Sequence, residues 1–540
     1  MRVWNKTCRI ATCAMDAAKP MRRKRSRNGH GSNRTDATRA KQPGMEETRR
    51  THSRGFAAAA HLSEKKFVDL ELSEATRKAL QDVLRYEKLT TVQDQAMPHV
   101  MEGKDVLARA RTGTGKTMAF LLPSVEQLHV HKPRKEQVSV LVLSPTRELA
   151  RQIRDEADGL LKFHPFQVQC VHGGTNANGE IKRLQSQRKD VLVATPGRLL
   201  DHLASASGLK ESLQELRMLV LDEADQLLEM GFLPDVERIL KQLPKNRQTM
   251  LFSATVPQKV HGVAGLAFKG DYVYVDTVGD EDVHTNEHVP QHGLIVPFAD
   301  QIQHLLHVLQ QHKAKPGHKV IVFLPTARMT QFLAEVMNKA GLGVMEIHSR
   351  KSQSYRTKVA STFRAAKEGI LLSSDVSARG MDYPDVTAVV QVGLPSSREQ
   401  YIHRLGRTGR AGKEGEGLLV LDPAESGFLA KLNDLPIQKL EHQAVPSEVN
   451  AQVEKALAGV PFQLKSQAYQ AWLGFYNSNL KQMRWDKPTL VQEANKWCTH
   501  AGLSSPPPLQ KSTISKMGLK GVPGLVVGPP TGSHQGGRRR

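Results

Sequence analysis

The segment DVLARARTGTGKTMAFLLP, residues 105–123, decides the fold of the region around it. It joins a short apolar strand to an apolar helix through a loop that contains two glycines. Glycines allow backbone N–H groups to face a phosphate, and the start of a helix adds positive potential there. The segment therefore predicts a phosphate-binding loop in a doubly wound parallel sheet, where ligands lie at the carboxyl ends of the strands.

The side chains of this loop are candidate ligands for a nucleotide. Lys116 is placed to contact the β- and γ-phosphates, and Thr117 to hold Mg²⁺ through its hydroxyl. The loop opens with Ala110 where the common pattern has glycine, and a Gly-rich turn without a ligand is the alternative. The loop residues predicted to contact the nucleotide are Ala110, Arg111, Thr112, Gly113, Thr114, Gly115, Lys116 and Thr117.

A second stretch, LVLDEADQLL at 219–228, ends an apolar run with two adjacent carboxylates. Asp222 is predicted to hold Mg²⁺ through water, and Glu223 to activate the attacking water as a general base. A solvated turn is the alternative, but it would leave the phosphate loop without its metal partner.

Short apolar runs bounded by polar or turn residues recur in two blocks, 65–275 and 291–425. Such runs predict buried parallel strands, and the segments between them predict crossover helices. Residues 276–290 are polar and nonperiodic, as in a linker. The predicted strands are 138–146, 190–198, 217–225 and 248–255 in the first block, and 318–326, 343–349, 369–376, 387–395 and 417–423 in the second.

The composition restricts the class of protein. Lys and Arg number 76 against 54 Asp and Glu, for a net charge of +22, which favours a polyanionic partner although the basic ends contribute part of the excess. The four cysteines form no CxxC pair, so we expect a reducing compartment. No apolar run approaches the roughly 20 residues needed to span a bilayer, and we expect no membrane association.

The two ends of the chain differ from its middle. Residues 1–60 are a basic leader that we expect to be disordered, and RGFAAAA at 54–60 is typical of an organellar processing site. The alternative is a basic tail that binds nucleic acid or directs nuclear import. We expect a mitochondrial location, with the nucleus, nucleolus and chloroplast as alternatives. Residues 426–525 predict a helical extension, and 526–540 a basic flexible tail.

A series of short motifs carries a resemblance over roughly residues 65–425. In their order along the chain they resemble the DEAD-box RNA helicases. The resemblance implies an α/β fold with two tandem RecA-like doubly wound parallel-sheet domains and a helical C-terminal extension. The motifs are YEKLTTVQ (86–93), ARTGTGKT (110–117), PTRELA (145–150), HGG (172–174), TPGR (195–198), DEAD (222–225), SAT (253–255), VFLPT (322–326), SSDVSARGMD (373–382) and YIHRLGRTGR (401–410).

The resemblance implies ATP and Mg²⁺ as cofactors and adds residues to the nucleotide site. Gln93 would read the adenine edge, and Tyr86 would stack on the base. Gly380 and Asp382 would contact the nucleotide from the second domain, Asp382 through the ribose. Arg85 stands where many members have Gly, and Thr90 stands where many have Pro, which puts only the local turn geometry in doubt.

The catalytic roles implied by the resemblance are divided between the domains. Arg407 and Arg410 would act as arginine fingers on the γ-phosphate, and such a finger is worth on the order of 10³–10⁵ in rate. His403 would link the phosphate site to the SAT segment, whose hydroxyls would couple hydrolysis to domain closure. The expected catalytic residues are Lys116, Asp222, Glu223, Ser253, Thr255, His403, Arg407 and Arg410.

RNA is the implied partner, with little sequence preference, because backbone N–H groups, hydroxyls and arginines suit phosphates and sugars. A structural salt bridge is the alternative role for Arg356 and Arg379. The predicted RNA contacts are Pro145, Thr146, Arg147, Gly173, Gly174, Thr195, Pro196, Gly197 and Arg198 in the first domain, and Gln353, Arg356, Ser374 and Arg379 in the second.

The segment YQAWLGFYNSNLKQMRW, residues 469–485, resembles the extension of the Mss116-like branch of this family. That resemblance implies packing on the second domain. We expect Trp472, Phe475 and Tyr476 to be core contacts rather than platforms for stacked bases.

The resulting hypothesis is an ATP-dependent RNA helicase whose ATP hydrolysis is stimulated by RNA and coupled to local, non-processive unwinding. We expect it to act as a monomer. Alternatives are an RNA-binding or annealing chaperone without ATPase activity and a DNA helicase. A small-molecule kinase is disfavoured, because the second α/β block would have no role in it. The sequence names neither the RNA nor the protein partners.

Overall fold

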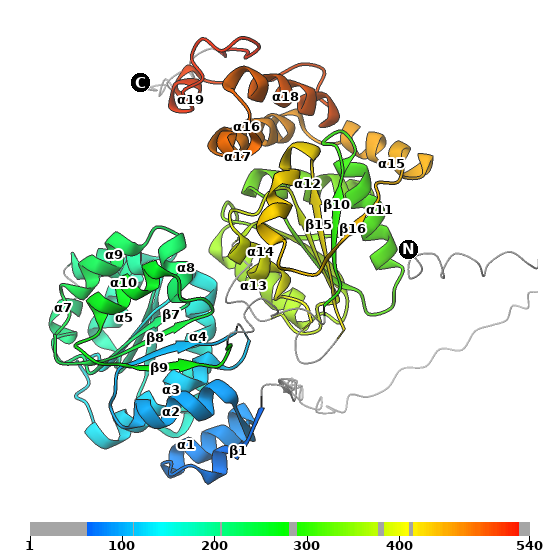
Figure 1. Cartoon of the computed structure of the whole chain (residues 1–540). Helices are drawn as coiled ribbons and strands as arrows, with labels where there is room; N and C mark the ends of the chain where they lie inside the picture. Colours follow the sequence, from blue (N-terminus) through cyan, green and yellow to red (C-terminus); the bar gives the residue numbers. More distant parts are fainter. Residues whose placement is uncertain are drawn as a thin grey trace, which may run out of the picture. The chain divides into compact units, whose positions relative to one another are not determined.

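Figure 1 shows the computed structural model of the chain, with two α/β domains followed along the sequence by a helical extension. The structure describes residues 62–111, 113–205, 208–279, 289–375, 383–409 and 414–528. The predicted leader lies outside the described residues, as do residues 280–288 of the linker and 529–540 of the tail. Five predicted site residues also lie outside them: Thr112, Arg379, Gly380, Asp382 and Arg410.

A seven-stranded parallel sheet forms the centre of the first domain. Its strand order is β5-β6-β4-β7-β8-β3-β9. Strands β4, β6, β7 and β8 are buried along their whole length, which explains their continuous apolar sequences. The strands are β3 (Val106–Arg109), β4 (Val140–Leu143), β5 (Val168–Val171), β6 (Val191–Ala194), β7 (Met218–Asp222), β8 (Gln248–Ser253) and β9 (Val273–Asp276).

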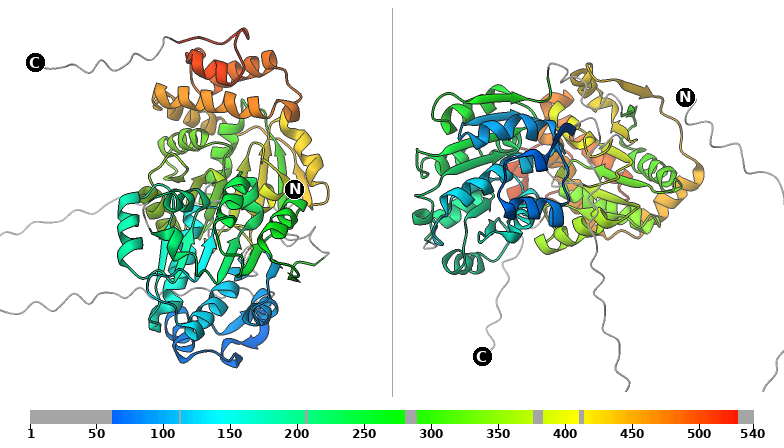
Figure 2. Two further views of the ribbon diagram at one scale, coloured as in Figure 1. Left: turned by 90° about the vertical axis from the view of Figure 1, so that its left-hand side faces the viewer. Right: turned by 90° about the horizontal axis from the view of Figure 1, so that it is seen from below.

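Helices cover both faces of this sheet (Figure 2), and each face has its own apolar core. Val140 and Val142 pack in one core and Leu141 and Leu143 in the other, because side chains alternate along a strand. An N-terminal pair of antiparallel strands, β1 (Leu62–Lys66) and β2 (Lys88–Thr90), precedes the sheet. The helices are α1 (Glu74–Lys78), α2 (Thr91–Met101), α3 (Lys116–His131), α4 (Arg147–Leu160), α5 (Ala177–Ser186), α6 (Pro196–Leu203), α7 (Leu209–Ser212), α8 (Ala224–Glu229), α9 (Leu233–Leu240) and α10 (Gln258–Ala267).

The second domain contains another seven-stranded parallel sheet, in the order β12-β13-β11-β14-β15-β10-β16. Its last strand lies beyond residue 425, where we expected the domain to end. That strand pairs with β10 as an edge strand, and its partly exposed sequence IQKL lacks a strong apolar signal. The strands are β10 (Gln291–Ile295), β11 (Lys319–Phe323), β12 (Met345–Ile347), β13 (Gly369–Ser373), β14 (Ala388–Val392), β15 (Glu416–Leu421) and β16 (Ile437–Leu440).

The core of the second domain continues into the C-terminal extension, since one apolar cluster runs from Val289 to Leu519. Trp472 and Tyr476 are buried in it and Phe475 is half-buried against it, which confirms their expected role as core contacts. The remaining helices are α11 (Gln301–Lys313), α12 (Ala327–Lys339), α13 (Gln353–Ala365), α14 (Arg398–Leu405), the 3₁₀ segment η8 (Pro423–Leu432), α15 (Ser447–Ala458), α16 (Phe462–Ser478), α17 (Leu480–Met483), α18 (Lys487–His500) and α19 (Lys511–Lys516).

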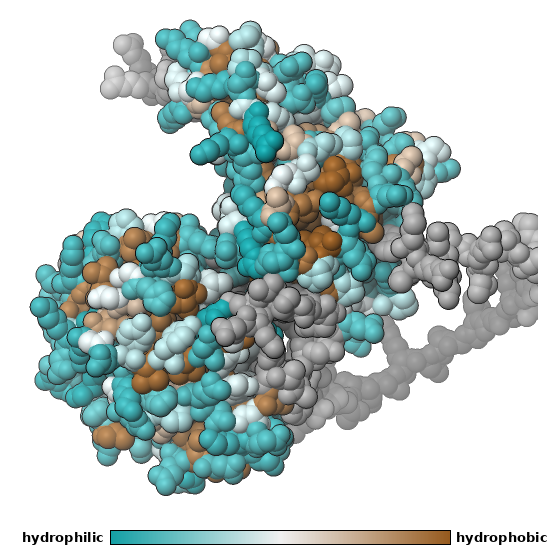
Figure 3. Space-filling view, in the orientation of Figure 1, coloured by the Kyte–Doolittle hydropathy of each residue, from teal (hydrophilic) through white to brown (hydrophobic). Residues whose placement is uncertain are grey.

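Hydrophilic residues cover most of the face shown in Figure 3. Within the described residues, no helix combines the length and the apolar character needed to cross a bilayer. The predicted fold class, two tandem parallel-sheet domains with a helical extension, is confirmed.

Candidate functional site

The sheet of the first domain brings the predicted site residues to one edge. Because all its strands are parallel, their carboxyl ends meet there. The segments PTR, GG and TPGR follow β4, β5 and β6, which are neighbours in the sheet. The phosphate loop and the DEAD and SAT segments lie at the ends of β3, β7 and β8, which are also neighbours. We call these groups the arginine half (β4, β5 and β6) and the carboxylate half (β3, β7 and β8) of the edge.

The phosphate loop leaves β3 and enters α3 through two glycines with positive φ. Gly113 has φ +81° and Gly115 has φ +87°, a conformation that favours glycine. A Cβ on Gly115 would lie 2.5 Å from Gln93 Nε2, so a side chain there would displace the glutamine. Lys116 is buried at the first position of α3, beside the half-buried Thr117. The loop thus has the glycine geometry and the buried cation that a phosphate requires.

The Gln93 amide connects the predicted adenine site to this loop. Its Nε2 donates to the carbonyl of Gly115 at 3.0 Å, and its Oε1 accepts from the Thr90 N–H at 2.9 Å. The Tyr86 hydroxyl donates to Glu156 at 3.0 Å. Gln93 is thus held against the loop and Tyr86 against α4, while recognition of adenine by Gln93 and stacking by Tyr86 stay predictions.

Arg85, just before Tyr86, adopts the left-handed conformation with φ +56°. A left-handed backbone costs a non-glycine residue roughly 1–2 kcal/mol. The turn into the adenine candidates therefore suits Gly better than Arg, and Arg85 is under strain there.

Two buried carboxylates face the loop lysine. Glu223 Oε1 lies 3.3 Å from Lys116 Nζ, and both side chains are buried. Burial, together with the adjacent Glu223 carboxylate, raises the pKa of Asp222 to about 7, although Lys116 lowers it. Glu223 has φ +49°, which turns the chain from β7 into α8. The arrangement fits the predicted roles: a metal ligand and a base beside a phosphate-binding cation.

Asp225, the last residue of the DEAD segment, also belongs to this site, although no role was predicted for it. Its Oδ2 accepts from the Thr255 hydroxyl at 2.9 Å, and its backbone N–H donates to Ser253 Oγ at 3.1 Å. His403 Nε2, from the second domain, lies 3.8 Å from the same Oδ2. The predicted link between His403 and the SAT segment therefore runs through Asp225. The signal for it was present in the motif itself.

In the second domain, α14 carries His403, and Arg407 lies in the turn after it. Arg407 is buried, and its Nε donates to the carbonyl of His403 at 3.2 Å. Arg404 is held by Asp375, at 2.8 Å from Nε and 2.6 Å from Nη2. His403 and Arg407 are thus fixed to each other, while the action of Arg407 on a γ-phosphate stays a prediction.

The arginine half of the edge is built around glycines. Arg147 packs against the Gly173–Gly174 backbone so closely that a Cβ on Gly173 would lie 2.9 Å from its Nη2. Gly174 has φ +84°. The Thr146 hydroxyl accepts from the Leu149 N–H at 3.2 Å and caps α4. Three predicted RNA contacts from two distant motifs, Arg147, Gly173 and Gly174, are therefore in direct contact.

Glu180, which no motif indicated, joins two of these segments. Its carboxylate accepts from Arg198 at 2.6 Å, lies 2.8 Å from His202 Nε2, and binds the Thr175 hydroxyl. Burial raises the pKa of Glu180, but the hydrogen bonds from His202, Thr175 and Arg198 outweigh burial and lower it to about 2. Thr195 and Pro196 begin α6, which carries Arg198. Glu180 therefore orients the arginine of the TPGR segment.

Two predicted RNA contacts of the second domain are bound to the first domain. Arg356 Nη2 lies 2.6 Å from Glu148 Oε1, and Gln353 Nε2 donates to the same oxygen at 2.9 Å. Burial lowers the pKa of Arg356 although Glu148 raises it. These contacts support the salt-bridge alternative for Arg356. Ser374 is buried, and its N–H donates to Ile347 O at 3.2 Å.

In the described part of the chain, no group of three or more His, Cys, Asp or Glu could hold a metal. Mg²⁺ commonly binds through one or two carboxylates and completes its shell with waters and substrate phosphates. Asp222 and Thr117, at the phosphate loop, match a Mg²⁺ site of this kind, in which waters and phosphates complete a small set of protein ligands.

Comparisons with known proteins agree with this geometry. Residues 90–263 match the family model "DEAD/DEAH box helicase", and residues 300–412 match "Helicase conserved C-terminal domain". The chain is 48% identical over 473 residues to DEAD-box ATP-dependent RNA helicase 26 of Oryza sativa subsp. japonica, covering 87% of this chain and 88% of that one. It is 48% identical to helicase 31 of Arabidopsis thaliana, covering 86% of this chain and 66% of that one.

Solved structures give the same result. The structure of Mss116p bound to ssRNA and AMP-PNP is similar with a TM-score of 0.76 and 30% identity, over 85% of this chain and 96% of that one. Mss116 bound to ssRNA and UDP-BeF gives a TM-score of 0.77 and 29% identity, over 86% and 98%. With the site geometry and the 48% identity to a relative covered over most of its length, these matches show that the chain belongs to the family of DEAD-box ATP-dependent RNA helicases.

Proposed function

We propose that this protein hydrolyses ATP when RNA is bound and uses the energy to separate short RNA duplexes locally. The observation that carries the proposal is the edge of the first-domain sheet. It places the Lys116–Glu223 pair, 3.3 Å apart, on the same edge as the arginine half. One sheet would thus present a nucleotide site and a polyanion site on the same edge.

At the nucleotide site, Lys116 and the backbone of Gly113 and Gly115 would bind the phosphates of ATP. Glu223 would accept a proton from the attacking water. Mg²⁺ held at Asp222 and Thr117 would neutralise the charge that develops on the phosphates. The guanidinium of Arg407, in the second domain, would also stabilise this developing negative charge. Hydrolysis would therefore require both domains.

At the proposed RNA site, Arg147, Arg198 and the Gly173–Gly174 backbone would supply cationic and N–H donors. These groups suit phosphates and sugars, which supports binding with little sequence preference. Preference for RNA over DNA would require contacts to the 2′-hydroxyl.

The test is ATP turnover by the purified full chain with no nucleic acid, with single-stranded RNA and with single-stranded DNA of the same sequence. We expect RNA to stimulate turnover and DNA to stimulate it much less. Equal stimulation by both would favour a DNA or general nucleic-acid helicase. No turnover in any condition, with RNA annealing retained, would favour the chaperone alternative, which the intact Lys116–Glu223 pair argues against.

We further propose a mitochondrial location and a monomeric enzyme. The basic, acid-poor composition of residues 1–60 supports the location. A fluorescent fusion of residues 1–64 would test it, and a nuclear or plastid signal would contradict it. Light scattering of the full chain would test the oligomeric state.

A further inference from the structure

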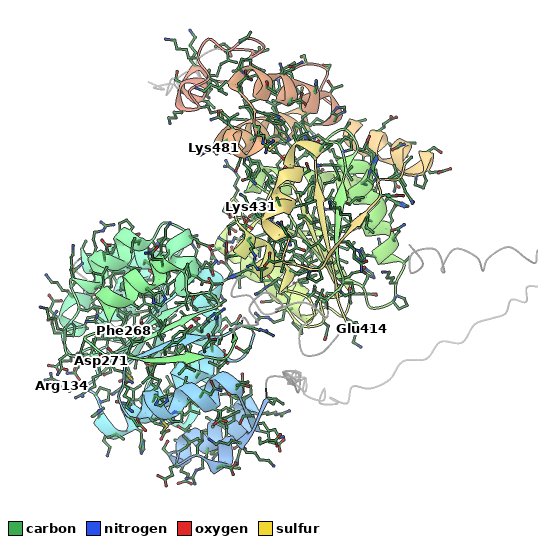
Figure 4. The ribbon with its side chains drawn as sticks, viewed as in Figure 1. Arg134, Phe268, Asp271, Glu414, Lys431 and Lys481 are labelled. Atoms are coloured by element: carbon green, nitrogen blue, oxygen red, sulfur yellow. The ribbon has the colours of Figure 1, made fainter. Side chains whose placement is uncertain are left out.

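A buried carboxyl group, that of Glu425, lies where the C-terminal extension meets the second domain. Glu425 is on η8, just after β15, and is 1% exposed. The Tyr476 hydroxyl, from α16 of the extension, donates to its Oε1 at 2.6 Å. Figure 4 labels Lys431 on η8 and Lys481 on α17, two elements that contact each other at this junction.

The same carboxyl group reaches the turn that leads to the predicted catalytic helix. Glu425 Oε1 also accepts from the Leu394 N–H at 3.2 Å. Leu394 lies between β14 and α14, the helix that carries His403 and precedes Arg407. One oxygen atom therefore binds both the extension and the start of the connection to α14.

That turn has little freedom to move. Gly393 has φ +78°, and a Cβ on it would lie 2.8 Å from Pro325 Cγ and 3.6 Å from Glu425 Oε1. Leu394 is itself buried. A shift of the Glu425 carboxyl group would therefore be transmitted to the backbone that enters α14.

A purely local role for Glu425 accounts for only part of these contacts. Its Oε2 accepts from the Asp422 N–H at 2.8 Å, and the Asp422 side chain accepts from the Ala424 N–H, which together cap η8. That cap leaves Oε1 free for Tyr476 and Leu394. Burial raises the pKa of Glu425 to about 7, although Tyr476 and the backbone N–H groups lower it. Burial of a carboxyl group costs free energy unless the group is hydrogen-bonded, so Glu425 depends on the N–H and O–H groups that donate to it.

We infer that Glu425 is a positioning residue through which the extension sets the turn before α14, and thereby the placement of His403 and Arg407 for ATP hydrolysis. This inference rests on the proposed ATPase function. It gives the extension a role in the rate of the chemical step, in addition to its packing.

The variant Tyr476→Phe tests the inference, because it removes one donor and keeps the ring among Phe298 and Trp472. The matched control is Tyr469→Phe on the same helix. The buried Tyr469 donates to Asn495 at 2.8 Å, entirely within the extension. Both variants lose one hydrogen bond of a tyrosine hydroxyl, and of the two hydroxyls only that of Tyr476 binds Glu425.

We expect Tyr476→Phe to lower the kcat of RNA-stimulated ATP hydrolysis about 3-fold to 10-fold, the worth of one hydrogen bond. The KM for ATP should stay within about 2-fold, because Gln93 and Lys116 bind ATP from the first domain. Tyr469→Phe should leave kcat unchanged, while thermal unfolding shows both variants folded. Glu425→Gln should lower kcat at least as much, since its amide would face the Leu394 or Asp422 N–H.

An unchanged kcat in Tyr476→Phe, or equal losses of kcat in Tyr476→Phe and Tyr469→Phe, would overturn the inference. If Glu425→Gln does not fold, the tyrosine pair still decides the question. A wild-type chain without RNA-stimulated turnover would instead refute the proposed function, so the two failures are distinguishable.

Discussion

The two halves of the first-domain sheet edge use charge in opposite ways. In the carboxylate half, Asp222, Glu223 and Asp225 are buried, and the pKa of Asp222 is raised to about 7. In the arginine half, the buried Glu180 is surrounded by donors, and its pKa falls to about 2. A carboxylate with few donors and a like-charged neighbour is available for a cation and a proton. A carboxylate saturated with donors acts as a structural anchor.

The comparison predicts that substitutions in the two halves have separable effects. The largest effect is expected for Glu223→Gln, which removes the proposed base and keeps the shape of the side chain. Turnover should fall about 10²–10⁴-fold, the usual contribution of a general base. ATP affinity should remain, and ATP should trap RNA on the variant. Single-turnover hydrolysis and nucleotide titration measure the two quantities, with the exposed Glu211→Gln as control. Fast RNA release in ATP would contradict the assignment.

The next effect concerns Glu180 and stability. Its pKa is lowered in the folded state, so the stability it contributes is present above the ordinary carboxyl pKa of about 4.3 and is lost as pH falls toward 2. The linkage corresponds to up to about 3 kcal/mol. Glu180→Gln should therefore destabilise the protein at pH 7 and reduce the loss of stability between pH 4.5 and 2. Urea unfolding at several pH values measures this, and an unchanged pH profile would refute the anchor role.

A smaller effect is expected for Arg147→Ala, in RNA binding without nucleotide. The affinity for RNA should fall about 10-fold, and by a similar factor for RNAs of different sequence. The slope of log affinity against log salt concentration should decrease by about one, which corresponds to one counterion fewer released. ATP affinity should not change, because Arg147 belongs to the arginine half. Arg154→Ala on the same helix, where the arginine pairs with Asp155, is the control. A loss restricted to one RNA sequence would argue against a phosphate contact.

The smallest effect is expected for a substitution at Arg85. This residue precedes the adenine candidate Tyr86 and belongs to neither half of the sheet edge. Arg85→Gly relieves the positive φ but adds unfolded-state entropy, for a net gain of at most about 1 kcal/mol in stability. Thermal unfolding of the full chain measures it. A loss of stability would indicate that Arg85 makes contacts that outweigh the strain.

Much of this architecture could be predicted from the sequence, because central parallel strands are continuous apolar runs. All nine strands predicted from such runs are present, and the strand before the phosphate loop, β3, is present as well. In the two seven-stranded sheets, the strands that sequence reasoning missed are β5, β9 and β16 at sheet edges and β10 beside β16. Edge strands are partly exposed, so their sequences are mixed and resemble loops.

The candidate site shows the same division. Residues whose role depends on their neighbours in the sequence, such as Lys116 beside Gly113 and Gly115, were predicted from the spacing of residues within a motif. Glu180 and Glu148 were missed as site residues, because their importance comes from partners elsewhere along the chain. Asp225 was missed although it lies in the DEAD motif. No sequence pattern predicts that a glutamate will accept hydrogen bonds from an arginine and a histidine about twenty residues away.

The continuous core shared by the second domain and the extension has a consequence for synthesis. Val289 and Leu519 belong to one apolar cluster, whereas the first domain closes its two cores by Val275. A ribosome can therefore release the first domain as a finished unit while the second still lacks part of its interior. Nascent chains that stall before Leu519 should expose apolar surface and recruit chaperones, and a premature stop codon there should yield an aggregating fragment rather than a shortened helicase.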